Sequence, residues 1–143
     1  MQTFLPYADF QKSAEVLDDK RLGKQRSESI IILKTLLGSY EREGGKGWPH
    51  HPATKMWKGF ELSLCNYSIE IAAAWRKRGH ADTTLDWFTE TKAALLNQTS
   101  APYWLGNDVF HRTHRSNLLR KMPEHYRQFW PDDRDDLPYL WPI

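Results

Sequence analysis

Several features of common protein classes are absent from this chain, and each absence narrows its class. Cys65 is the only cysteine, so no disulfide can form within one chain, and we expect a reducing, cytoplasmic location. The chain start lacks the basic and apolar regions of a secretory signal peptide, and the apolar runs are too short to cross a bilayer. The net charge is only +2, which excludes a uniformly basic nucleic-acid coat. Repeats and low-complexity linkers are lacking too, so we expect one domain, residues 1–143.

Motifs for nucleotide binding and serine chemistry are also missing. The sequence contains no Walker loop, no Gly-x-Gly-x-x-Gly and no serine nucleophile elbow. His111 and His114 stand three residues apart, but no carboxylate or cysteine follows at the spacing of a metal site. We therefore expect no metal and no other cofactor. For His50 and His51, which precede Pro52, a role in helix capping or packing and a place in an active site both stay open.

The periodicity of the chain is helical, because strand-like alternation is nearly absent and apolar residues recur every three or four positions. We therefore predict an all-α fold, a single compact helical domain with an irregular, aromatic C-terminal tail. Asp9 can cap a short helix that ends at Val16, and a glycine-rich loop covers 41–49. Further helices are predicted over 19–37, 54–78, 84–96 and 107–122, with a short helical turn over 124–130. The stretch 54–78 has the clearest apolar stripe, so we place it as the long central helix.

Cations are unevenly distributed, and the first cluster carries the strongest functional signal. Four of the seven residues between Lys20 and Arg26 are cations. On a helix, positions i, i+3, i+4 and i+7 share one face, which here comprises Arg21, Lys24, Gln25 and Glu28. Most such faces are simply solvated surfaces with ion pairs. A carboxylate among phosphate-seeking groups nevertheless weakens binding of a polyanion, so its presence favours chemistry on that polyanion.

The chain start is a second candidate for chemistry. A free α-amine has a pKa of about 7.7–8, against about 10.4 for lysine, so roughly a tenth of it is neutral and nucleophilic at pH 7. Phe4, Leu5 and Pro6 are apolar, and they can anchor the start against a core. An amine held beside an acid and a sugar forms an imine readily. A carboxylate such as Glu28 stabilises the positive charge that develops at C1′ when a glycosidic bond breaks.

Three segments, taken in order, carry a family resemblance. The first joins the chain start to Leu17-x-x-x-x-Leu22-x-x-x-x-x-Glu28, the second is Ile69-Glu70 with Arg76-Lys77-Arg78-Gly79, and the third is Lys121-Met-Pro-Glu-His-Tyr126-Arg-Gln-Phe-Trp130. In these positions the chain resembles the pyrimidine-dimer DNA glycosylase/AP-lyase family, the phage endonuclease V-type enzymes. The resemblance places it in a bacterial or phage branch. The chain departs from the family pattern at Ser27, where the family has an arginine, and at His125, which replaces an aromatic residue.

The resemblance implies an all-α DNA-repair enzyme that needs no metal. In this family the N-terminal α-amine attacks C1′ of the 5′ nucleotide of a cyclobutane pyrimidine dimer. The base leaves, a Schiff base forms, and β-elimination nicks the strand. The candidate catalytic residues are then Met1, Gln2 and Glu28. The nucleophile is Met1 if the initiator methionine stays, as is usual before glutamine, or Gln2 if it is removed.

The resemblance and the basic clusters together imply a partner, double-stranded DNA that carries a damaged base. The residues expected to contact DNA are Arg21, Lys24, Gln25, Arg26, His111, Arg112, Arg115, Lys121, His125, Tyr126 and Arg127. Two alternatives stay open, a non-catalytic DNA-binding module on the same fold and a glycosylase for another modified or damaged base. We expect a monomer without membrane contact.

Overall fold

A computed structural model describes residues 1–38 and 48–143. Within these ranges there are seven helices and no strand, so the all-α prediction is confirmed. The helices are α1 (Phe10–Val16), α2 (Asp19–Leu36), α3 (Pro52–Lys55), α4 (Glu61–Lys77), α5 (Leu85–Ala93), α6 (Asp108–Lys121) and α7 (Pro123–Tyr126). Residues 131–143 form an irregular tail. The predicted loop over 41–49 lies largely outside the described residues.

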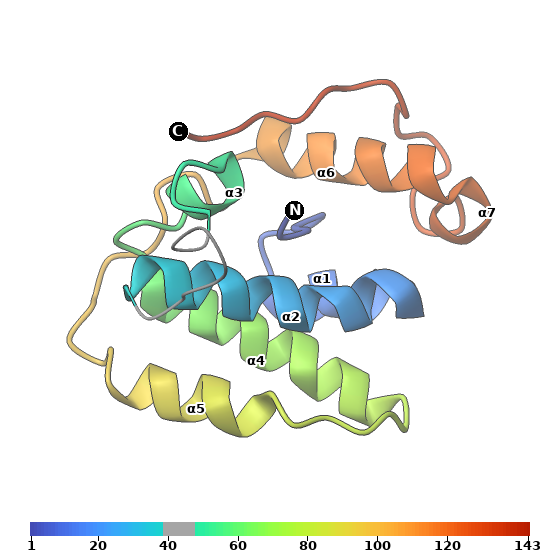
Figure 1. Cartoon of the computed structure of the whole chain (residues 1–143). Helices are drawn as coiled ribbons and strands as arrows, with labels where there is room; N and C mark the ends of the chain where they lie inside the picture. The colour runs from blue at the N-terminus through green and yellow to red at the C-terminus, as the bar shows by residue number, and fades with distance from the viewer. Residues whose placement is uncertain (39–47) are drawn as a thin grey trace.

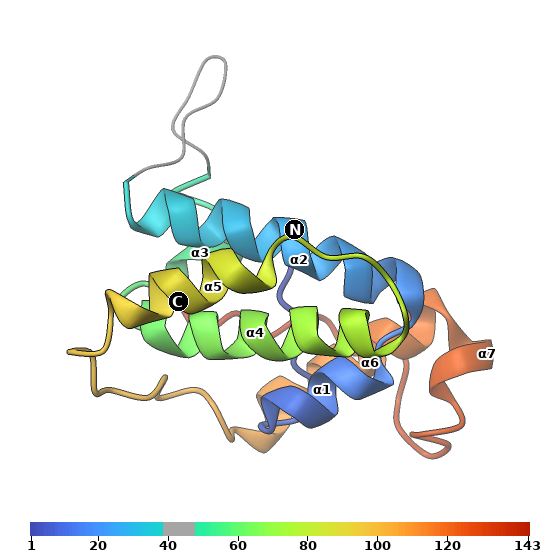
Figure 2. The ribbon, with the colours of Figure 1, turned by 90° about the horizontal axis from the view of Figure 1, so that it is seen from below.

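The arrangement of the helices places the start of the chain in the middle of the molecule. α4 packs against α1, α2 and α5, and Figure 2 shows these four helices side by side. The N-terminal segment lies between α2 and α6, and the C-terminal tail runs back along α6 toward α3 (Figure 1). Hydrogen bonds to side chains of α6 hold the tail there, among them those donated by the backbone N–H groups of Leu137 and Leu140.

Side-chain caps set the starts of three helices. Asp9, Asp18 and Asn107 each accept a hydrogen bond from the backbone N–H three residues further on, at 2.8, 3.4 and 3.1 Å. The predicted starts at 9, 19 and 107 therefore lie within one residue of those in the structure. α5 and α7 end three and four residues earlier than predicted, at Ala93 and Tyr126.

The predicted helix over 54–78 is wrong at its N-terminal end. Residues 52–55 form the one-turn helix α3, and α4 begins only at Glu61. Gly59, which lies between them, has a φ of +86°, a left-handed conformation that interrupts a right-handed helix. α4 therefore has 17 residues against 18 in α2, and the prediction of one long central helix is not confirmed.

α2 and α4 approach each other closely at Gly23. A Cβ atom added to Gly23 would lie 2.8 Å from the ring of Trp75 on α4. The Trp75 ring is itself held between the Arg26 guanidinium, 4.6 Å from its centroid, and the stacked ring of His80 at 3.9 Å. This contact fixes the separation of the two helices beneath the site described next.

Candidate active site

The first residues of the chain form no helix, yet their backbone groups are bonded to three helices. The N–H of Phe4 donates to Gln25 Oε1 on α2 at 2.9 Å, and the N–H of Leu5 donates to His114 Nδ1 on α6 at 2.9 Å. From α4, the Tyr67 hydroxyl lies 2.8 Å from the Phe4 carbonyl oxygen. Chain starts ordinarily fray. Here the start is held at a defined place between α2 and α6 (Figure 1).

α6 anchors the same segment with three side chains. Besides the bond that His114 accepts from the Leu5 N–H, His111 Nδ1 bonds to the Leu5 carbonyl at 2.8 Å, and Arg115 donates to the Pro6 carbonyl at 3.0 Å. Burial lowers the pKa of His114 to about 3 and lowers the pKa of His111 as well, so both rings are neutral at neutral pH. His111 is only 4% exposed, and its ring is engaged with the backbone rather than with the surface expected to contact DNA.

Gln25 joins the chain start to the predicted catalytic carboxylate. Its Oε1 lies 2.8 Å from the Tyr67 hydroxyl in addition to the Phe4 N–H, and its Nε2 donates to the Gln2 carbonyl at 2.8 Å and to Glu28 Oε2 at 3.0 Å. The side chain is buried, with 1% of the residue exposed. The amide group of Gln25 is thus fully used within the protein, and a contact between Gln25 and DNA stays a prediction.

Glu28 extends from α2 toward the first two residues. The backbone N–H of Gln2 donates to Glu28 Oε2 at 3.2 Å, beside the bond from Gln25. Lys24 Nζ lies 3.8 Å from Glu28 Oε1. These contacts fix the orientation of the carboxylate and leave Oε1 as the less engaged oxygen.

A hollow of about 320 Å³ opens over these groups. Cations from α2 and α6 line the hollow together with the carboxylate, which suits binding of a polyanion. The lining contains the predicted catalytic residues and several of the predicted DNA contacts. The residues that line it are Met1, Gln2, Phe4, Lys20, Arg21, Lys24, Gln25, Glu28, Lys121 and Tyr139.

Tyr126 supports one of the lining cations from behind. Its hydroxyl donates to Asp18 Oδ1, and the Arg21 guanidinium donates to the same oxygen at 3.2 Å. Burial acts to raise the pKa of Asp18, but these hydrogen bonds, the charge of Arg21 and a hydrogen bond from its backbone together outweigh burial and lower that pKa. Tyr126 is fully buried, so it positions Arg21 through Asp18 and presents no surface to a ligand.

The remaining predicted DNA contacts lie outside the hollow, and each has a partner within the chain. The acidic segment 131–136 supplies the partners of Arg115 and Arg127. For all of these residues, contact with DNA stays a prediction. The contacts are Arg26 with Asp82, Arg112 with Asp108, Arg115 with Asp133, His125 with the Val16 carbonyl and Arg127 with the Asp133 carbonyl, at 2.6 to 2.9 Å.

Met1 also borders a second hollow, of about 530 Å³, and His51 is among the residues that line it. His51 Nδ1 accepts a hydrogen bond from the Ala53 N–H at 3.0 Å and so caps α3. Burial, and then the positive charge of the chain start, lower the pKa of His51, while Glu28 acts to raise it. His51 is therefore both a cap and a neighbour of the chain start.

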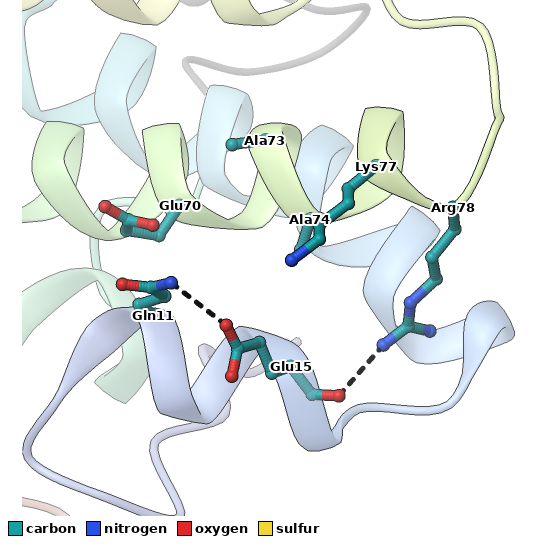
Figure 3. A pocket seen from close by; sticks show the side chains of 7 residues that line it. All are labelled: Gln11, Glu15, Glu70, Ala73, Ala74, Lys77 and Arg78. Atoms are coloured by element: carbon teal, nitrogen blue, oxygen red, sulfur yellow. Dashed lines mark hydrogen bonds between the residues drawn. The ribbon is translucent and has the colours of Figure 1, made fainter.

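A separate hollow of about 390 Å³ lies between α1 and α4 (Figure 3). Hydrogen bonds join three of its polar residues, since Gln11 donates to the Glu15 carboxylate at 3.0 Å and Arg78 donates to the Glu15 carbonyl at 3.2 Å. The described residues that line it include none of the predicted catalytic or DNA-binding ones. The hollow at the chain start is therefore the candidate site.

Two other negative findings apply to the described part of the chain. In residues 1–38 and 48–143, no three His, Cys, Asp or Glu side chains gather as a metal ion would require. None of the helices that the structure describes has the length and apolar character needed to traverse a bilayer.

Several residues that order the site have no functional signal in the sequence. Tyr67 belongs to an apolar stripe, and Trp57, in the same stripe, donates from Nε1 to Thr3 Oγ1 at 3.0 Å. The sequence indicates only that each side chain has a polar partner, because a buried tyrosine hydroxyl or indole N–H needs a hydrogen bond. Sequence alone does not show that these partners belong to the chain start.

The first residues of the chain, a carboxylate and several cations thus meet at one hollow, an arrangement that suits an anionic substrate. The model of one family, pyrimidine dimer DNA glycosylase, matches residues 1–88 of the 143, and the chain belongs to this family. The matched span contains every lining residue of the site except Lys121 and Tyr139. No curated protein and no solved structure matches the chain.

Proposed function

We propose that this protein is a DNA-repair N-glycosylase with AP-lyase activity, and that its substrate is the cyclobutane pyrimidine dimer in double-stranded DNA. One observation carries the proposal. The backbone N–H of Gln2 donates to Glu28, so the first residues of the chain lie beside this carboxylate in a hollow lined by cations. The family supports the removal of a damaged pyrimidine. The cations Lys20, Lys24 and Lys121 supply contacts for phosphates on either side of the lesion.

The proposed reaction begins with the amine of Met1. Its lone pair forms a bond to C1′ while the bond from C1′ to the base breaks and its electron pair leaves with the base. The deoxyribose ring then opens between C1′ and O4′ to give the Schiff base. Loss of a proton from C2′ expels the 3′ phosphate, and water later releases the amine. Glu28 stabilises the positive charge at C1′ and carries protons between these steps.

We infer that Met1, rather than Gln2, supplies the amine. The Gln2 N–H is bonded to Glu28, its Oε1 accepts the Thr3 N–H at 2.9 Å, and the residue is 6% exposed. Gln2 is therefore used as an internal residue. Met1 is partly exposed and borders both hollows at the site.

The test is trapping with borohydride on two duplexes, one containing a pyrimidine dimer and one containing an abasic site. We expect a covalent adduct on both, mapped by peptide mass to Met1. Glu28→Gln should abolish base excision while DNA binding persists. Glu15→Gln, the same change at an exposed carboxylate on α1, is the matched control and should change neither.

Each alternative gives a different result. Binding without an adduct on either duplex would refute the amine mechanism and favour a non-catalytic module. An adduct on abasic DNA alone would keep the lyase and assign the base removal to another lesion.

A further inference from the structure

The carboxamide of Gln2 holds an unused hydrogen-bond donor at the site. Its Oε1 accepts the Thr3 N–H at 2.9 Å, which fixes the orientation of the amide group. Its Nε2 is buried and meets no acceptor among the residues that the structure describes. Gln2 also lines the hollow that contains Glu28.

A buried donor without a partner costs free energy, so it calls for an explanation. Other side-chain atoms in the described ranges share this state, on Arg26, Ser29, Thr54 and His114, but none of those residues lines the hollow. Tyr139 does line it, and burial raises the pKa of Tyr139 to about 12 while the nearby Gln2 amide acts to lower it. The Gln2 amide and the Tyr139 hydroxyl are therefore neighbours, but their contact falls outside the length and angle of a normal hydrogen bond, so it does not satisfy the Gln2 donor.

We propose that Gln2 Nε2 donates a hydrogen bond to O2 of the pyrimidine that is being removed. This inference rests on the proposed function and deepens it. When the bond from C1′ to N1 breaks, its electron pair moves onto N1 and spreads to O2 through C2. A fixed donor at O2 stabilises the negative charge that develops there. The proton that finally neutralises the base is the one that the amine loses, carried by Glu28.

Position and chemistry both favour this acceptor. Gln2 directly follows the residue that attacks C1′, and O2 is separated from C1′ by only two atoms, N1 and C2. Phosphates already have the cations of the hollow as partners. A neutral amide is suited to a neutral carbonyl, and O2 is retained when C5 and C6 of the pyrimidine are saturated in a dimer.

The role has a specific signature, because it applies to base removal and not to strand cleavage at an abasic site. An abasic site has no base, so it offers no O2. Loss of the donor should therefore slow excision of the dimer much more than the lyase reaction on abasic DNA. A merely structural role would slow both reactions together.

Two variants test the inference on the full-length protein. Gln2→Met keeps an unbranched side chain of similar size and removes the donor, and Gln2→Glu keeps an oxygen for the Thr3 N–H and replaces the donor with an acceptor. Both place a large residue after Met1, and intact mass verifies that Met1 remains. Gln11→Met, at an exposed glutamine of α1, is the matched control.

The measurements are single-turnover rates on the dimer duplex and on the abasic duplex. We expect both Gln2 variants to lower the ratio of excision rate to lyase rate by about 100-fold, the typical effect of removing one such donor, and the control to leave it unchanged. A ratio equal to wild type, whether both rates fall together or neither falls, overturns the inference. Failure of the proposed function is a separate result, in which the wild-type protein forms no adduct on either duplex.

Discussion

Replacement of Gln25 with leucine should remove the hub that joins the chain start to α2. Leucine has a similar size and no polar group, so Gln25→Leu leaves the N–H of Phe4 and the carbonyl of Gln2 without their partners. Each unsatisfied buried group costs roughly 1–3 kcal/mol. The Tyr67 hydroxyl still reaches the Phe4 carbonyl, so we count two lost groups and expect the free energy of unfolding to fall by about 3 kcal/mol.

The free energy of unfolding can be measured by urea denaturation followed by tryptophan fluorescence. Glu28 also loses the donor that orients Oε2, so excision should fall in the same variant, with protein concentration corrected for the folded fraction. Gln11→Leu, at an exposed glutamine, serves as control and should change the free energy by less than about 0.5 kcal/mol. A loss below about 1 kcal/mol for Gln25→Leu, with excision intact, would refute the reasoning about the hub.

Four further predictions test other parts of the structure. Gly23→Ala should destabilise the protein by about 1–2 kcal/mol, because the new Cβ would press on Trp75; helix propensity alone predicts the opposite sign, and a raised Tm would show that α2 and α4 can separate freely. Trp57→Ala should cost about 3–5 kcal/mol in urea denaturation, since the ring is fully buried; a near-neutral change would remove it from the core. Lys24→Ala should weaken DNA binding and reduce the slope of log K against log salt by about 0.9, and an unchanged slope would reject a phosphate contact. Because the folded-state pKa of Asp18 lies below its unfolded value, Asp18 contributes stability that is lost as pH falls through the folded pKa; Asp18→Asn should flatten the decline in stability below about pH 4, and a profile parallel to wild type would count against this.

The helices could be read from the sequence where local signals were sufficient. Asp9, Asp18 and Asn107 are capping residues, and their side chains need only the backbone three residues away. The break before α4 was missed, because an apolar stripe continues through Trp57 and Phe60. Gly59 was the signal available, but its left-handed conformation depends on how α3 and α4 pack.

The candidate site, like the helices, was predictable only where its residues are close in sequence. Arg21, Lys24 and Glu28 lie on one face of a single helix, so their spacing alone placed them together, and the structure has them in one hollow. The sequence could not show which cations of α6 face solvent. It shows that Arg115 is charged, but not that the C-terminal tail covers the face of the helix on which Arg115 lies. In the structure, Asp133 of the acidic segment 131–136 pairs with Arg115, a contact between distant parts of the chain that the sequence analysis did not predict.

The bonds that hold the first residues have a consequence for the timing of synthesis. Leu5 is bonded to His114 and to His111, which follow it by 109 and 106 residues. A ribosome needs roughly 5–20 seconds to add that many residues, and during this interval the start of the nascent chain has no partners on α6. Enzymes that trim or acylate new chains meet an unanchored segment then, before the bonds to α6 hold Leu5 in place. In the proposed reaction, the amine of Met1 can therefore acquire its chemical form before the segment that follows it is anchored.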